Sequence, residues 1–159
     1  MKKRMVACLV ILCLAVLSYA RAQGGTPAPQ KERCPVCGMF VSMFADWNTE
    51  IRFNDSSRAI FDGPKDMFKY YLDMEKYNPS KTKDQVTAIL VKDYFSRTSV
   101  DALKAFYVIW GDVYGPMGHE PIPFEKKADA KKFLKEHKGK KIMSFKEISL
   151  KVIQALDNP

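Results

Sequence analysis

Cys34 and Cys37 are the first side chains in the sequence whose type and spacing could do chemistry. They form a Cys-x-x-Cys pair, and the chain continues through Gly38 to Met39. In an oxidising compartment such a pair can be a structural disulfide, which is the default, a redox motif, or a soft-metal site to which Met39 adds a thioether. Redox chemistry of the thioredoxin kind needs the first cysteine at a helix N-terminus, and Gly38 followed by Phe40 argues against a helix there.

A second candidate segment, residues 115–121, carries Met117 and His119 among glycines and prolines. If the segment is extended, side chains two residues apart project from the same face, so a thioether and an imidazole would point the same way. Taken alone, the segment is better explained as a turn in which Met117 packs and His119 is solvated, because isolated Met and His are usually structural. Zinc is short of ligands, since His119 and His137 do not have zinc-finger spacing.

The two segments are more informative together than apart. Thiolate, thioether and imidazole form a ligand set that selects Cu(I) over magnesium, calcium or manganese. The sequence offers no obvious pair of base and nucleophile, so we expect a carrier of Cu(I) in a low-coordinate site rather than an enzyme. Two alternatives stay open: a thiol–disulfide oxidoreductase that uses Cys34 and Cys37, and a binding domain that relies on partner contacts alone.

Residues 1–22 have the features of a secretory signal peptide. Three basic residues are followed by an apolar run from Met5 to Leu17, which is short for a membrane span, and then by small residues at Ala20 and Ala22. We expect cleavage after Ala22 and a periplasmic location, with an uncleaved tether as the alternative. No cysteine follows the apolar run as a lipoprotein signal requires, so a lipid anchor is not expected.

The chain beyond residue 22 keeps two of the four cysteines and about half of the formal charge of +8. Residues 23–33 are rich in glycine and proline and predict a flexible linker. The modest charge, with few aromatic residues between Lys126 and Lys141 to stack on bases, argues against a nucleic-acid partner. An apolar content of 47% predicts a packed core.

Patterns of apolar residues predict the elements that must position the candidate side chains. β-Favouring residues on both sides of residues 54–57 predict a hairpin of strands 49–53 and 58–61. An aspartate cap and an early proline at 62–64 open a helix that ends at 78–79. Further strands are expected at 87–91, 105–110, 122–124 and 140–143, a helix with its apolar face at 130–137, and a last helix opened by a capping box at 144–147.

The two halves of the chain align without a gap at an offset that places Phe61 on Phe124 and Asp66 on Asp129. Two copies of a strand–strand–helix–strand unit would produce this match, and so would chance among common residues. In either case the elements predict an α+β fold, with antiparallel strands and helices on one side.

Taken in order, several motifs make the chain resemble the NosL family of nitrous-oxide reductase accessory proteins. The motifs are Cys34-x-x-Cys37-Gly38-Met39, Phe61-Asp62-Gly63-Pro64, and the run from Tyr114 to Phe124 followed by Ala128-Asp129-Ala130. The resemblance implies a periplasmic Cu(I)-binding chaperone that delivers copper for assembly of a copper enzyme, usually nitrous-oxide reductase. Many members of the family look like lipoproteins, and this chain departs from them in lacking the lipoprotein signal.

The resemblance also implies a fold and part of a ligand set. The fold is two related ββαβ-type units, similar to part of an organomercurial lyase, which we expect at residues 34–98 and 99–159. The second unit would carry the C-terminal helix. The family motifs place copper ligands at Cys37 and Met117. Ligand chemistry adds Cys34, His119 and Met39 to the predicted metal site.

Overall fold

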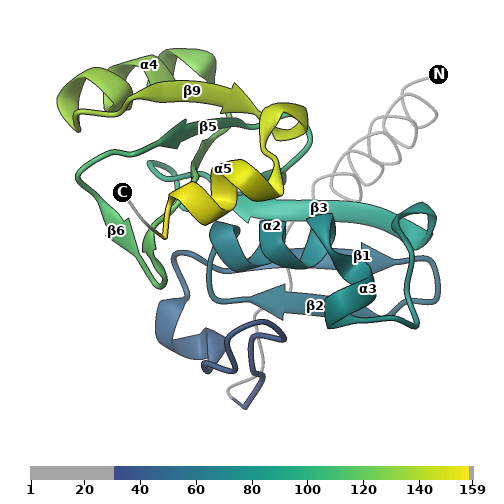
Figure 1. Cartoon of the computed structure of the whole chain (residues 1–159). Helices are drawn as coiled ribbons and strands as arrows, with labels where there is room; N and C mark the ends of the chain where they lie inside the picture. The colour runs from purple at the N-terminus through teal and green to yellow at the C-terminus, as the bar shows by residue number, and fades with distance from the viewer. Residues whose placement is uncertain (1–30, 158–159) are drawn as a thin grey trace, which may run out of the picture.

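The computed structural model describes residues 31–157, and within them the chain folds into two larger antiparallel sheets, each covered by a helix, and a small two-stranded sheet (Figure 1). The predicted signal peptide, residues 1–22, lies outside the described residues, and so does most of the predicted linker at 23–33. At the end of that linker Arg33 pairs with Phe40 in an isolated β-bridge. No helix among residues 31–157 is long and apolar enough to cross a membrane.

The first sheet has the strand order β2-β1-β3-β4. Its strands are β1 (Thr49–Phe53), β2 (Arg58–Phe61), β3 (Val86–Lys92) and β4 (Ser99–Asp101). The predicted hairpin of β1 and β2 is confirmed, and its turn is held by Asp55, whose carboxylate accepts the backbone N–H of Ser57 at 3.1 Å. The sequence did not predict β4, because a strand of three residues is too short to show alternation.

Helix α2 (Pro64–Leu72) covers the first sheet and begins where the sequence predicts, with Pro64 in its first turn. The prediction of one helix continuing to residue 78 is wrong, because Asp73 leaves the helical region at φ −132° and ψ 58°. Aspartate is a poor helix former, since it bonds nearby backbone groups in other conformations. After the break, the short helix α3 (Met74–Tyr77) begins with Met74 in the core, where it is 5% exposed.

The second sheet repeats the topology of the first. Its elements are β5 (Phe106–Ile109), β8 (Ile122–Phe124), helix α4 (Lys127–Glu136) and β9 (Lys141–Ser144). The order β8-β5-β9 corresponds to β2-β1-β3, so each unit is ββαβ with its first strand in the centre. Phe61 and Phe124 end equivalent strands, and Asp66 and Asp129 lie in the first turns of equivalent helices. Two related ββαβ units with antiparallel strands are therefore confirmed.

The predicted boundaries of the two units, at 34–98 and 99–159, stay a prediction. Strand β4 pairs with β3, and the last helix, α5 (Leu150–Ala155), packs against α2. Figure 1 shows α5 lying beside α2 of the first unit. Both elements follow residue 98 in the sequence but contact the first unit in space.

The capping box near the end of the chain forms as predicted. The prediction that it opens the last helix is wrong. The backbone N–H of Ser144 donates to the carboxylate of Glu147 at 2.7 Å, and the box closes only a 3₁₀ turn, η3 (Phe145–Glu147). Ile148 then returns to extended backbone at φ −79° and ψ 116° and is buried, which ends the turn. Helix α5 begins after Ser149, whose hydroxyl accepts a backbone N–H of the first turn.

One aromatic core joins the two units. Phe68 of α2 lies 5.2 Å from Tyr107 of β5 and 4.9 Å from Phe145 of η3, measured between ring centroids. A second, smaller core beneath α4 contains Phe124 and Phe133. The shared core therefore holds α2 against elements of the second unit.

Candidate metal-binding site

The cysteine segment closes into a tight loop before the first strand. The backbone N–H of Cys34 donates to the carbonyl of Met39 at 2.8 Å, and that of Gly38 donates to the carbonyl of Cys34 at 2.9 Å. Gly38 has φ +78°, a left-handed conformation that glycine adopts without strain. The chain next enters the 3₁₀ turn η1 (Val41–Phe44), so neither cysteine of the loop stands at the N-terminus of an α-helix.

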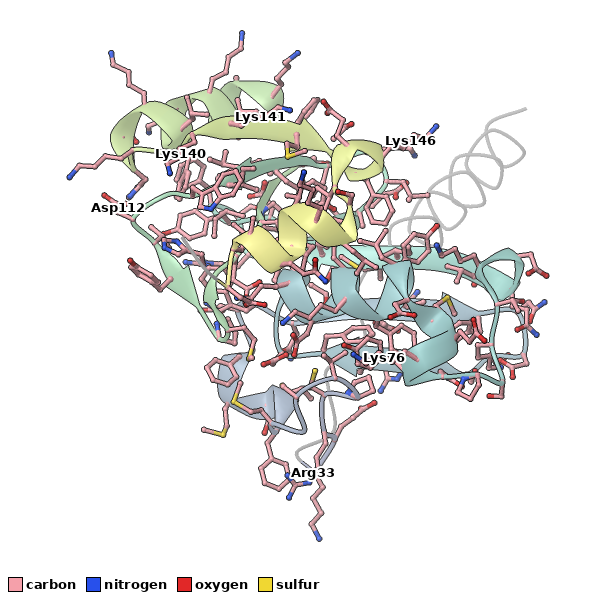
Figure 2. The ribbon with its side chains drawn as sticks, viewed as in Figure 1. Arg33, Lys76, Asp112, Lys140, Lys141 and Lys146 are labelled. Atoms are coloured by element: carbon pink, nitrogen blue, oxygen red, sulfur yellow. The ribbon has the colours of Figure 1, made fainter. Side chains whose placement is uncertain are left out.

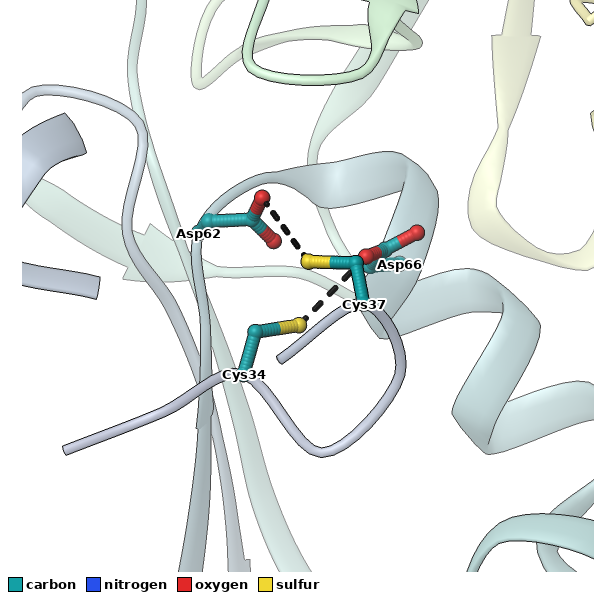
Figure 3. Close-up of side chains that lie close together, drawn as sticks. All are labelled: Cys34, Cys37, Asp62 and Asp66. Carbon is teal, nitrogen blue, oxygen red and sulfur yellow. Dashed lines mark hydrogen bonds between the residues drawn. The ribbon is translucent and has the colours of Figure 1, made fainter. Parts of the chain in front are cut away.

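Two aspartates that the sequence did not nominate as ligands face the two thiols (Figure 3). The thiol of Cys34 donates to Oδ2 of Asp66 at 3.4 Å. The thiol of Cys37 donates to Oδ2 of Asp62 at 3.3 Å. Each of the four side chains offers one sulfur or oxygen atom, and these four atoms lie within 4.8 Å of one another. We call these four residues the Cys–Asp cluster; its spacing suits a single metal ion.

Asp62 has a different role from the one that the sequence predicted. It directly follows β2, and the structure shows Gly63 at the N-cap of α2 with no side-chain cap bond. Asp66 lies in the first turn of the same helix. The spacing of these two aspartates, four residues apart at a helix start, was visible in the sequence and is the signal that could have nominated them.

Three of the four residues of the Cys–Asp cluster are buried, and Cys37 is half-buried. The two aspartates are 0% exposed and Cys34 is 2% exposed. In the described part of the chain, Oδ1 of Asp62 and Oδ1 of Asp66 are buried without a hydrogen-bond partner, and the ammonium of Lys69 approaches the latter only to 3.8 Å. Buried carboxylate oxygens without partners are costly, and a bound cation would satisfy them. The donor set therefore fits a metal ion.

Burial also sets the protonation of the two cysteines, which are free thiols. Loss of solvation raises the pKa of Cys37 to about 12, and it raises the pKa of Cys34 as well. Desolvation raises the pKa of Asp66 in the same way. Nucleophilic and redox-active cysteines have lowered pKa values, so these thiols lack that character. A metal ion that binds them has to displace their protons.

Met117 lies at the tip of a small hairpin between β6 (Tyr114–Gly115) and β7 (Gly118–His119). Gly118 adopts φ +81° there. At Gly115 an added Cβ would lie 2.5 Å from the side chain of Glu120 and 3.0 Å from the ring of Trp47, so only glycine fits. Figure 1 shows this hairpin extending toward the start of α2 and the segment that begins at residue 31.

Glu120 fastens the Met117 hairpin to the start of α2. Its carboxylate is buried, and it accepts the backbone N–H of Met117 at 3.1 Å and that of Lys65 at 2.6 Å. The ammonium of Lys65, also buried, donates to the carbonyl of Met117 and to Asp157 at 2.8 Å. Burial raises the pKa of Glu120 to about 8. The sequence did not nominate Glu120 or Lys65, because charged residues are usually exposed.

Cys37, Asp66 and Met117 line one pocket of about 390 Å³. The side chains of Lys69 on α2 and Ile153 on α5 complete parts of its wall. Cys37 and Met117 are eighty residues apart in the sequence, and only the packing of the two units brings them to one cavity.

His119 and Met39 are placed differently. The ring of His119 lies 4.6 Å from that of Tyr114 between centroids, and its Nδ1 is buried without a hydrogen-bond partner among the described residues. Neither His119 nor Met39 is among the residues that line the pocket, and His119 is not part of the Cys–Asp cluster. The structure thus groups Cys37 with Met117 at the pocket and with Cys34 in the Cys–Asp cluster, and His119 and Met39 do not line the pocket. The ligand roles of all five residues stay predictions.

The fold and the site define an α+β protein with a buried cluster of thiols and carboxylates suited to a metal ion. The family model NosL matches residues 26–153, and the chain belongs to the NosL family. Its fold is similar to the crystal structure of the copper chaperone NosL from Shewanella denitrificans, with 22% identity over 81% of this chain and 98% of that chain and a TM-score of 0.67. It is also similar to apo-NosL from Achromobacter cycloclastes, with 22% identity over 66% and 87% of the two chains and a TM-score of 0.46. No curated protein matches the sequence.

Proposed function

We propose that the protein is a metallochaperone that carries Cu(I) for the assembly of a copper enzyme. The observation that carries the proposal is that Cys37 and Met117 line one pocket, while Cys34 lies within the same small cluster as Cys37. Thiolate and thioether are soft ligands, which favour Cu(I) over the hard cations magnesium, calcium and manganese. The relative from Shewanella denitrificans, which shares the fold, is described as a copper chaperone and supports the same role.

Binding of the cargo would exchange protons for copper. Burial keeps the thiols of Cys34 and Cys37 protonated, so each thiol that becomes a ligand releases a proton. The carboxylates of Asp62 and Asp66 accept the hydrogen bonds of these thiols, and their negative charge would attract the incoming cation. A Cu(I) ion held by only two or three soft ligands keeps an open position, through which a receiver can take it by ligand exchange.

For the receiver we propose nitrous-oxide reductase or its assembly machinery, and for the location the periplasm, after removal of residues 1–22. Three of the five large apolar side chains that are exposed in the described chain belong to the segments that build the site. These are Phe40, Met43 and Tyr114. Exposed apolar groups that cluster on a surface mark interaction sites, so this end of the molecule supports a docking partner.

A competition titration tests the copper assignment. Cu(I) is titrated against a chromogenic chelator under anaerobic reducing conditions, using the native chain and the double variant Cys37→Ser, Met117→Ala. The matched control is Met43→Ala, because Met43 is 69% exposed and does not line the pocket. We expect one Cu(I) per chain, an unchanged control, and a loss in the double variant above the roughly 100-fold that outer-shell changes produce. Equal affinity of the native chain and the double variant would refute the assignment.

The alternative, a thiol–disulfide oxidoreductase, is opposed by the raised pKa values of the two thiols. Insulin reduction and the reduction potential of the Cys34–Cys37 pair would separate the two functions. Catalytic insulin reduction by a chain without measurable Cu(I) affinity would replace the chaperone proposal with the oxidoreductase.

A further inference from the structure

The positive charge of the protein is concentrated on one side of the second unit. Residues 126–146 carry nine lysines and two acidic residues, whereas the rest of the chain beyond residue 22 carries thirteen basic and sixteen acidic residues. All nine lysines are exposed, and they lie at the N-cap of α4, on α4, on the loop that follows it, on β9 and on η3. We call this surface the lysine face. The remainder of the chain is close to neutral or slightly acidic.

The lysine face lies on the side of the molecule away from the Cys–Asp cluster. Figure 2 shows Lys140 and Lys141 beside α4, and Arg33, which precedes Cys34, at the opposite end. Within residues 31–157, none of the nine lysines takes part in an ion pair with a carboxylate, whereas Lys65 and Lys69, outside the lysine face, are paired with aspartates. The charge of the lysine face is therefore free to act on a partner.

We propose that the lysine face docks the protein on the surface of a bilayer that contains anionic lipid, with the Cys–Asp cluster directed away from the membrane. Clusters of four to eight basic residues attract anionic lipid headgroups, and each lysine near the surface contributes independently. This inference does not depend on the identity of the metal cargo.

The kind of basic residue favours a bilayer over a nucleic acid. Residues 126–146 contain no arginine, the side chain that reads base edges and phosphates through its planar fork. Lysine is a compact, hydrated charge that needs no fixed partner geometry, as on a fluid headgroup layer. Aromatic rings lie at the margins of the lysine face. The ammonium of Lys132 lies 5.5 Å from the ring centroid of Phe95, which is 43% exposed. The ammonium of Lys140 lies 5.5 Å from the ring centroid of Trp110. Such rings suit a membrane interface.

Vesicle sedimentation tests the proposal. The full chain is mixed with vesicles of phosphatidylcholine alone and with vesicles that also contain phosphatidylglycerol. The readout is the ratio of the two partition coefficients, compared between the native chain and variants that all carry residues 1–22 and their basic side chains unchanged. We expect a strong preference for the anionic vesicles, and its loss at high salt. The variant Lys131→Gln, Lys135→Gln, Lys141→Gln should lower the ratio about 100-fold.

A matched triple variant keeps the test specific. Lys76→Gln, Lys83→Gln, Lys104→Gln removes the same charge from exposed lysines outside residues 126–146 and should change the ratio less than about threefold. Equal losses in the two triple variants would overturn the proposal, because net charge alone would then explain the binding. No preference for anionic vesicles would overturn it too, as would tighter binding to duplex DNA than to anionic vesicles at the same salt.

Discussion

Removal of the Glu120 carboxylate should loosen the hairpin that carries Met117. The side chain is 1% exposed and accepts two backbone N–H groups, from Lys65 at 2.6 Å and from Met117 at 3.1 Å. A buried N–H left without an acceptor costs about 1–3 kcal/mol. Glu120→Ala leaves two such groups and should lower the free energy of unfolding by about 2–6 kcal/mol. Glu120→Gln keeps one acceptor oxygen and should cost about 1–3 kcal/mol.

Urea unfolding at neutral pH, followed by tryptophan fluorescence, measures these losses. A domain is stable by only about 5–15 kcal/mol, so Glu120→Ala can fail to fold, and Glu120→Gln is then the informative variant. Glu136→Gln is the control, because that glutamate is exposed on α4 and should change stability by less than about 0.5 kcal/mol. If Glu120→Gln were as stable as Glu136→Gln, the two hydrogen bonds would not hold the hairpin, and the reasoning would be wrong.

Three further results are expected. Because burial raises the pKa of Glu120 to about 8 in the folded chain, the folded form holds that proton at higher pH than the unfolded chain does. The free energy of unfolding should thus fall between about pH 5 and pH 8, and this group should contribute up to about 1.4 kcal/mol per pH unit. A pH series of urea titrations should show that Glu120→Gln lacks this contribution. The same pH dependence of the unfolding free energy in the native chain and in Glu120→Gln would contradict the prediction. Asp66→Asn should lower the pKa of Cys37, since the carboxylate of Asp66 contributes to raising it, and the ultraviolet absorbance of the thiolate should appear at lower pH; an unshifted midpoint would show that desolvation acts alone. Met43→Ser, Tyr114→Ser should slow copper transfer to the receiving enzyme while leaving the Cu(I) affinity unchanged, and equal transfer rates would exclude this surface from docking.

Local patterns predicted most of the secondary structure. The hairpin strands appear at 49–53 and 58–61 as predicted, because β-favouring residues and a polar turn are local signals. The errors are also local. Asp73 divides one predicted helix into two, and Ile148 ends the turn of a correctly predicted capping box before it becomes a helix. The first break falls at aspartate, a poor helix former, and at the second the buried Ile148 returns to extended backbone.

The candidate site was predicted only in part. Cys34, Cys37 and Met117 could be nominated because sulfur ligands are rare and chemically distinctive. Asp62 and Asp66 were not nominated, since carboxylates are common and usually solvated. The sequence does place both aspartates at the start of one helix, but a single sequence does not predict that the start of this helix faces the cysteine loop.

The sequence by itself determined which ligand chemistry the protein can offer and where most strands and helices begin, because residue type and local periodicity decide both. Tertiary structure alone decided which side chains meet. Cys34 reaches Asp66 across 32 residues, and Glu120 reaches the backbone of Lys65 across 55. The first contact lies within the first unit, and the second joins the two units, which share one aromatic core that holds α2 against the second unit. The same burial removes water from the two thiols and from the carboxyl of Asp66, and it raises their pKa values.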